Sequence, residues 1–255
     1  MKNAKKWITR ILLLVCICVF VYSAYNLLNI YFDYKKIDDD YGEIESTYVQ
    51  VPEKEDEEYL KIDWASLIAR NEDVKAWIQI PDTEVNYPVL QGETNDTYIH
   101  SDIDKKDFKA GCIFIASENQ APFTDLNTVI YGHNMKNGSM FNNIKSYTEQ
   151  DFANSHPYVY IYLPDGTVSK YTVVAGNIVS ETSVIYNTSI TDIQSFYSEM
   201  LKDNDISVDF DQSLNQPVIT LSTCTSGGSE SGKRNVVHAV LERNGIDPNA
   251  EKMNQ

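Results

Sequence analysis

The sequence predicts a mainly β domain, folded as a closed or nearly closed β-barrel of eight strands, behind an apolar N-terminal helix. Eight short runs rich in Val, Ile, Tyr and Thr are spread over residues 76–241. Turn residues such as Pro81-Asp82 and Pro164-Asp165-Gly166 bound these runs, as is typical of strands. Many short strands at this spacing favour a barrel. A chain of 255 residues has room for one well-cored domain and a short appendage.

The N-terminus has the pattern of an uncleaved signal anchor. Four of its first ten residues are basic: Lys2, Lys5, Lys6 and Arg10. The following apolar run, residues 11–22, is long enough to span a membrane if it continues through residues 27–30. A cleaved signal peptide competes with this interpretation because Ala24 is small, but Tyr22 occupies the position where a second small residue is expected. We therefore expect residues 1–32 to form a cytoplasmic basic end and a single-pass anchor, with the rest of the chain outside the cell.

An acidic segment separates this anchor from the body of the chain. Residues 33–58 include Asp38, Asp39 and Asp40 and an almost continuous acidic run from Glu53 to Glu58. Such a segment has little to bury, and the sequence predicts a solvated extracellular spacer. The formal net charge of −16 and the absence of a cluster of Lys and Arg in the soluble part argue against a nucleic-acid partner.

The catalytic domain is expected to occupy residues 59–255 and to begin with a helix. Apolar side chains at Leu60, Trp64, Leu67 and Ile68 recur at helical spacing within residues 59–71. The expected strands follow it: Ala76–Ile80, Val85–Leu90, Gly111–Ala116, Thr128–Tyr131, Tyr158–Leu163, Val168–Val179, Pro217–Cys224 and Asn235–Leu241.

Two helical segments interrupt the expected strands. One covers Met140–Tyr147, and the other covers Thr191–Lys202 within a long strand connection. The second has one apolar face, and Thr191 or Asp192 is placed to cap it.

The cysteines indicate a reactive thiol in place of a disulfide framework. Cys16 and Cys18 belong to the apolar N-terminal run, which leaves only Cys112 and Cys224 in the body. A bridge between these two remains open from sequence, but a lone thiol is the more economical interpretation. Cys224 ends a predicted strand and precedes the flexible loop 225–229, a position that suits a nucleophile. A small buried apolar residue is the alternative.

Two further residues at strand ends complete a reactive set. His133 follows Tyr131 and Gly132 at the end of one strand, and its imidazole is suited to protonate a leaving amine and to deprotonate an incoming one. Arg234 lies ten residues after Cys224, where a hairpin returns it to the thiol. Its forked guanidinium is suited to stabilise an oxyanion, and Lys233 beside it is the natural comparison.

These motifs together resemble the sortase family. The segment Thr220-Leu221-Ser222-Thr223-Cys224, Arg234 and the upstream Tyr131-Gly132-His133-Asn134 carry the resemblance, which covers nearly everything from Tyr59 to Leu241. The N-terminal helix and the helix in the long strand connection are similar to class B sortases. Membership implies an eight-stranded barrel and a Cys-His-Arg site. The implied reaction is a transpeptidation: cleavage of a C-terminal sorting signal after Thr through a thioacyl-enzyme, and transfer of the secreted protein to a peptidoglycan precursor or cross-bridge amine of a Gram-positive cell wall.

The same resemblance implies substrate-binding positions. Four residues match positions that line the substrate groove: Asn95, Tyr131, Ser222 and Thr223. The glycine-rich loop 225–228 after the nucleophile departs from the class B pattern. We expect His100 to be a surface residue and His238 to be packed within a strand. No spacing indicates a zinc site or a phosphate-binding loop, so no metal or cofactor is expected.

Two other functions compete with this assignment. The chain order, with His133 well before Cys224, argues against a papain-like peptidase and an L,D-transpeptidase. A membrane-tethered β-domain that binds a wall component without catalysis would share the same composition and anchor. The co-occurrence of one Cys, one His and one Arg at strand ends argues against it.

Overall fold

The computed structural model describes residues 2–50 and 59–248. The chain divides into two compact units, residues 1–43 and residues 44–255. The second unit carries the barrel and every predicted site residue.

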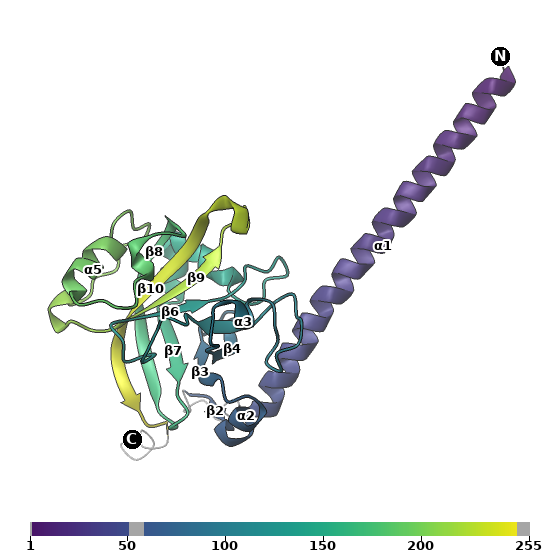
Figure 1. The fold of residues 1–255 in the computed structure, drawn as a ribbon. Coiled ribbons are helices and arrows are strands. Elements are labelled where there is room, and N and C mark those ends of the chain that lie inside the picture. Colours follow the sequence, from purple (N-terminus) through teal and green to yellow (C-terminus); the bar gives the residue numbers. More distant parts are fainter. Residues whose placement is uncertain (1, 51–58, 249–255) are drawn as a thin grey trace. The chain divides into compact units, whose positions relative to one another are not determined.

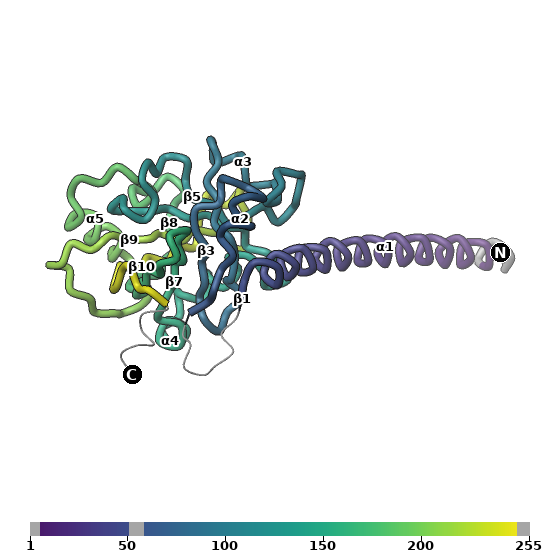
Figure 2. Tube along the Cα trace, turned by 90° about the horizontal axis from the view of Figure 1, so that it is seen from below, coloured from purple at the N-terminus to yellow at the C-terminus, as the bar shows by residue number. Residues whose placement is uncertain are grey.

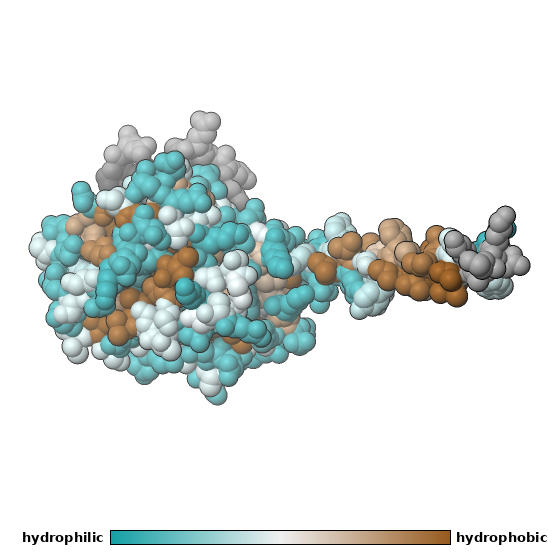
Figure 3. All heavy atoms as spheres, turned by 90° about the horizontal axis from the view of Figure 1, so that it is seen from above, coloured by the Kyte–Doolittle hydropathy of each residue, from teal (hydrophilic) through white to brown (hydrophobic). Residues whose placement is uncertain are grey.

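One long helix dominates the N-terminal unit. Helix α1, Lys2–Tyr48, is 47 residues long, and its segment Lys6–Tyr48 contains a window that is long and apolar enough to cross a membrane. Hydrophobic surface covers much of the described part of this helix in Figure 3. Residues 33–48, which belong to the predicted solvated spacer, are helical as the continuation of α1, and residues 51–58 lie outside the described residues.

The body of the second unit is a closed eight-stranded barrel, ordered β10-β8-β7-β3-β4-β5-β6-β9 (Figure 1). Two neighbouring pairs, β4 with β5 and β6 with β9, are parallel, and the other pairs are antiparallel. The barrel strands are β3 Val74–Gln79, β4 Asn86–Leu90, β5 Ile113–Ile115, β6 Asn127–Tyr131, β7 Tyr158–Tyr162, β8 Val168–Ser180, β9 Val218–Cys224 and β10 Lys233–Ile246. All eight predicted strands are therefore confirmed, with small changes at their ends. A further pair, β1 Val49–Gln50 and β2 Lys61–Ile62, forms a separate two-stranded sheet.

The helices differ more from the expectation. Helix α2 is shorter than predicted, Trp64–Arg70, because Asp63 caps its N-terminus by accepting a hydrogen bond from the Ser66 amide. The segment predicted at 140–147 is a 3₁₀ helix, η1 Asn142–Thr148. The remaining elements were not expected from the sequence: α3 Asp96–Ile99, α4 Gln150–Ser155, η2 Val184–Tyr186, η3 Gln212–Leu214 and η4 Ser229–Ser231.

The predicted helix of the long connection is α5, Ile193–Met200, capped by Asp192. It lies on the outside of the barrel in both ribbon and tube views (Figures 1 and 2). Its buried face forms a hydrophobic cluster with strand residues: Val174, Ile185, Ile193, Phe196, Tyr197, Met200, Val218, Val236 and Val240. This cluster holds the whole β8–β9 connection against β8, β9 and β10.

Candidate active site

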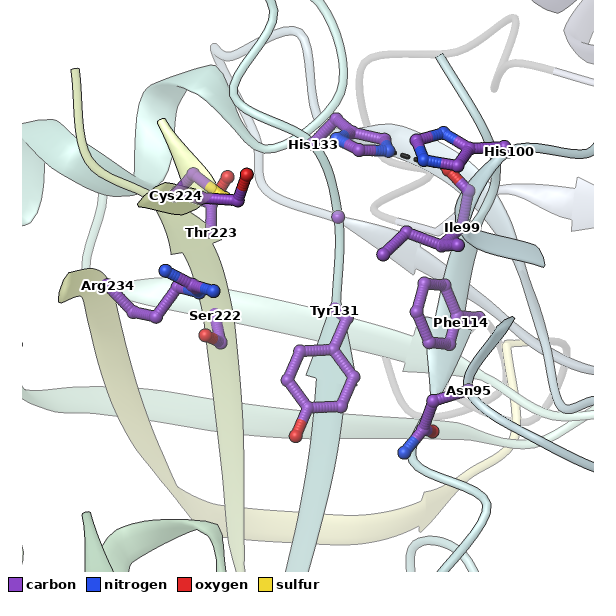
Figure 4. A pocket seen from close by; sticks show the side chains of 12 residues that line it. Asn95, Ile99, His100, Phe114, Tyr131, His133, Ser222, Thr223, Cys224 and Arg234 are labelled. Carbon is purple, nitrogen blue, oxygen red and sulfur yellow. Dashed lines mark hydrogen bonds between the residues drawn. The ribbon is translucent and has the colours of Figure 1, made fainter. Parts of the chain in front are cut away.

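A pocket of about 270 Å³ opens at the edge of the barrel where β6 and β9 end (Figure 4). All seven predicted site residues line it: Asn95, Tyr131, His133, Ser222, Thr223, Cys224 and Arg234. They come from β6, β9, β10 and the segment before α3, which are far apart in the sequence. The fold thus brings the complete predicted set into one cavity.

The parallel pairing of β6 and β9 brings His133 and Cys224 to the same edge. Tyr131 is the register partner of Ser222, and the Gly132 amide donates a hydrogen bond of 3.1 Å to the Ser222 carbonyl. Both chains then leave the sheet in the same direction, because parallel strands end at a common edge. In Figure 4, Cys224 lies at the end of β9, and His133 lies just beyond the end of the strand that carries Tyr131, with its ring turned toward Ile99 and His100.

The backbone of the nucleophile candidate is fixed from two sides. The carbonyl of Cys224 accepts hydrogen bonds from two side-chain amides, those of Asn134 at 2.8 Å and Asn235 at 3.2 Å. The thiol is free and half-buried. Cys112 forms no disulfide either; it is buried, and its sulfur contacts the Ser101 carbonyl. The structure therefore contains no bridge between these two cysteines.

Gly132, which lies between Tyr131 and His133 in the chain, is packed closely against Phe141 and Ile113. A Cβ atom at this position would lie 2.7 Å from the ring of Phe141 and would also overlap the side chain of Ile113. The absence of a side chain lets the chain turn over the end of the barrel and carry His133 to the pocket.

The His133 ring is oriented by a main-chain carbonyl. Its Nε2 lies 2.6 Å from the oxygen of Ile99, and a carbonyl only accepts, so Nε2 carries the proton in this arrangement. Burial lowers the pKa of His133 below its ordinary value, the Ile99 contact opposes this effect, and the neighbouring His100 adds to it. The ring is therefore neutral over more of the pH range than an exposed histidine would be.

His100 lies in the pocket, which the sequence did not indicate. Its ring is stacked on His133 with centroids 5.5 Å apart and planes inclined by 18°, and both rings are drawn together in Figure 4. The expectation that His100 has a surface role is incomplete, because its exposed ring also lines the cavity. His100 caps the C-terminus of the short helix α3. The sequence analysis did not predict this helix, and so it could not place His100 at the pocket.

Arg234 is the second residue of β10 and lies directly opposite the nucleophile candidate. It is the register partner of Cys224, as the predicted hairpin requires. Its Nη2 donates to Glu181 at 2.6 Å and its Nη1 donates to the Lys233 carbonyl at 3.0 Å. The side chain is 19% exposed, so it faces the pocket edge while two protein acceptors hold it.

Two of the predicted substrate-binding residues are already hydrogen-bonded within the protein. The Asn95 amide donates to Glu118 at 3.0 Å and accepts from the Ser117 backbone at 2.9 Å. The Ser222 hydroxyl lies 2.9 Å from the hydroxyl of Tyr186. These side chains therefore build the pocket wall through defined partners.

The other two predicted substrate-binding residues differ from each other. Tyr131 lies between the rings of Phe114, 5.5 Å away, and Tyr186, 6.1 Å away, and burial raises its pKa. The Thr223 hydroxyl is buried and has no hydrogen-bond partner within the described part of the chain.

The two remaining histidines, His156 and His238, do not line this pocket. His238 is completely buried within β10, as predicted for a packed strand histidine. His156 stacks on Phe152 at the end of α4. Within residues 2–50 and 59–248, no group of His, Cys, Asp and Glu side chains is arranged to hold a metal ion.

Comparison with known proteins identifies one family. The model of the Sortase domain family matches residues 78–242. Sortase B of Staphylococcus aureus is 29% identical over 240 residues, which cover 92% of this chain and 95% of the relative. Sortase B of Listeria monocytogenes is 32% identical over 176 residues, which cover 67% of this chain and 70% of the relative.

Solved structures agree with this result. A 2.0 Å crystal structure of Staphylococcus aureus sortase B superposes with a TM-score of 0.67 at 26% identity, covering 82% of this chain and 97% of that one. A sortase B–substrate complex from the same organism gives a TM-score of 0.66 at 26% identity, with coverage of 82% and 94%.

Proposed function

The chain belongs to the sortase family as a class B-like cysteine transpeptidase, and from this premise we propose that Cys224, His133 and Arg234 carry its reaction. The proposed substrate is a secreted protein with a C-terminal sorting signal, which is cleaved after Thr. The proposed acceptor is an amine of a cell-wall peptide. The observation that carries the proposal is the meeting of these three side chains in one pocket at the edge of the barrel.

The first half of the proposed reaction forms a thioester. The Cys224 thiolate attacks the carbonyl carbon of the scissile bond, and the resulting oxyanion is stabilised by the guanidinium of Arg234. The tetrahedral intermediate collapses as the C–N bond breaks, and protonated His133 gives its proton to the leaving amine. The N-terminal product stays bound to Cys224 as an acyl group.

The second half reverses these roles. Neutral His133 removes a proton from the incoming wall amine, which attacks the thioester carbonyl. A new amide bond forms as the C–S bond breaks, and the Cys224 thiolate leaves. With water in place of the amine, the same steps give hydrolysis, so both acyl transfer and slow hydrolysis are expected.

The proposal includes the membrane as a partner. Helix α1 holds a segment apolar enough to cross a bilayer, and basic residues precede it, so the domain would lie outside the cell. External protease should then digest the domain in intact cells. Protection in intact cells, with digestion only in inverted membranes, would reverse this topology.

A peptide-library assay on the full chain in detergent tests the activity. We expect the wild type to cleave a subset of peptides after Thr and to join the product to an added amine. Cys224→Ala should have no turnover and no acyl-enzyme detectable by mass spectrometry. Cys112→Ala is the matched control and should keep most activity, because Cys112 is buried and does not line the pocket. Turnover in Cys224→Ala, or an inactive Cys112→Ala that is folded, would contradict the assignment.

Labelling of the thiol separates catalysis from simple binding. A methanethiosulfonate should modify Cys224 rapidly, as followed on its proteolytic peptide, and the rate should fall in His133→Ala. Equal slow rates in both proteins would instead indicate a wall-binding domain with an ordinary thiol.

A further inference from the structure

Asn127 connects strands β6 and β9 to the segment that supports the pocket. It begins β6 and is completely buried. Its Nδ2 donates to the carbonyls of Ile185 and Asn187, both at 3.0 Å. Its Oδ1 accepts a hydrogen bond of 2.7 Å from the Thr220 hydroxyl. Both N–H groups of the Asn127 side chain therefore donate to one segment, nearly sixty residues away in the sequence. Buried networks in which every polar group has a partner fix the local geometry.

The residue between those two carbonyls contacts the pocket. Tyr186 places its hydroxyl 2.9 Å from the Ser222 hydroxyl and stacks its ring on Tyr131 at 6.1 Å. Ser222 and Tyr131 both line the cavity. Burial raises the pKa of Tyr186 to about 12, so the phenol keeps its proton as a hydrogen-bond donor at physiological pH. Tyr186 therefore supports two walls of the pocket at once.

We propose that Asn127 is a positioning residue that holds residues 185–187 in place, so that Tyr186 fixes Tyr131 and Ser222 for substrate binding. The inference rests on the proposed function, because it takes the pocket as the substrate site. Asn127 itself does not line the cavity. Its expected effect is on substrate affinity, through Tyr186, and the bond-breaking step at Cys224 is left intact.

A second buried asparagine provides a matched control. Asn177 in β8 is 3% exposed, and its Nδ2 also donates to two carbonyls of the β8–β9 connection, those of Met200 and Lys202, at 3.2 and 3.1 Å. It therefore holds the end of α5, whereas Asn127 holds the segment beside the pocket. Alanine at either position removes a comparable buried amide, but only one of them supports Tyr186.

Hydrogen–deuterium exchange on the full chain in detergent tests the structural part without any substrate. The amides of Tyr186 and Asn187 donate within η2, and Asn127→Ala should speed their exchange. Asn177→Ala should instead speed exchange near residues 200–204 and leave the Tyr186 segment unchanged. Unchanged exchange at 184–187 in Asn127→Ala would overturn the proposal.

Kinetics with the best-cleaved library peptide test the functional part. Asn127→Ala should raise KM by about tenfold with kcat nearly unchanged, as loss of uniform binding predicts. Asn177→Ala should change KM by less than about twofold, as a residue with no contact to the site predicts. An equal KM in the two variants would overturn the proposal, as would a loss confined to kcat.

Two further variants keep the test decisive if Asn127→Ala folds poorly. Asn127→Ser retains a hydroxyl that can donate to only one of the two carbonyls, so it should give a smaller rise in KM. Tyr186→Phe removes only the hydroxyl that meets Ser222, and adding Asn127→Ser to it should raise KM by less than the product of the single effects. If the effects on KM were fully multiplicative, Asn127 would not act through Tyr186.

A wild-type chain that cleaves no peptide would defeat the proposed function, while the exchange data would still decide whether Asn127 holds the segment.

Discussion

Arg234 uses two of its guanidinium N–H groups on the protein itself. One holds Glu181 and the other holds the Lys233 carbonyl. A guanidinium has five N–H groups, so three remain for a substrate oxygen. The Glu181 contact holds the fork at the pocket edge, and the proposed oxyanion role needs donors that are held in place before the reaction. Lys233 is exposed and does not line the cavity.

Substitution of these two neighbours gives a prediction about the transition state. Arg234→Ala should lower kcat and kcat/KM together by about a hundredfold or more, because an oxyanion donor acts mainly in the transition state. Steady-state kinetics on the selected peptide measure this. Lys233→Ala is the matched control and should stay near wild type.

The lysine variant separates charge from geometry. Arg234→Lys keeps the positive charge but loses the planar fork, so partial rescue would show that charge matters most. A rise in KM alone for Arg234→Ala would assign the residue to substrate binding. Wild-type kinetics in both alanine variants would remove Arg234 from the mechanism.

At the same scale, the sequence indicated seven of the residues that line the pocket, but it did not indicate His100 or the residues behind the pocket wall. Cys224, His133 and Arg234 were recognisable because reactive side chains at strand ends are uncommon in a barrel. His100 and Tyr186 were not, since α3 and η2 bring them in, and elements of three or four residues have too few positions to show a period. Asn127 gave no signal because its partners are 58 and 60 residues away.

Among the secondary-structure elements, those with a clear pattern of residue types along the sequence were the ones predicted. All eight barrel strands were found because each combines β-branched or aromatic residues with flanking turn residues. The parallel pairing of β6 with β9, which builds the pocket edge, was not predictable, because pairing partners depend on the whole topology. The acidic composition of residues 33–48 predicted a solvated spacer, but charged residues also occur in exposed helices, and α1 continues through them.

Helix α5 depends on packing for its stability, because eight residues are too few for an isolated helix in water. Phe196 is 6% exposed and belongs to the cluster that joins this helix to the barrel. Phe196→Ala should therefore lower the free energy of unfolding by about 3 kcal/mol or more. Denaturant unfolding of the full chain in detergent, followed by circular dichroism, measures this.

The control for this prediction lies on the same connection. Leu214 is 60% exposed, and Leu214→Ala should change stability by no more than about 0.5 kcal/mol. Equal losses in the two variants would show that the connection is uniformly sensitive and that the cluster does not carry its stability.

For the molecule as a whole, the buried histidine behind the site links stability to pH. His238 is buried between β10 and α5, with its ring centroid 6.1 Å from that of Phe196. Its Nδ1 lies 3.0 Å from the Thr220 hydroxyl, and its Nε2 has no partner in the described part of the chain. Burial lowers the pKa of His238 from 6.5 to about 3, because a charged imidazole is costly in an apolar interior. The folded protein therefore keeps this ring neutral at pH values where the unfolded chain protonates it.

The direction of the pH effect follows from proton uptake. Between about pH 6.5 and pH 3 the unfolded state binds one more proton at this residue, so acidification favours unfolding and stability falls with pH. One proton corresponds to about 1.4 kcal/mol per pH unit, or about 2 kcal/mol of stability lost by pH 5 relative to pH 7.5.

His238→Gln keeps a hydrogen-bonding group near Thr220 but cannot titrate, so the stability that this variant loses between pH 7.5 and pH 5 should be smaller by that amount. Urea unfolding at both pH values measures the difference, and His156→Gln at the end of α4 is the control that removes an only partly buried histidine. Parallel pH curves for wild type and His238→Gln would show that the buried ring does not set the acid sensitivity of the fold.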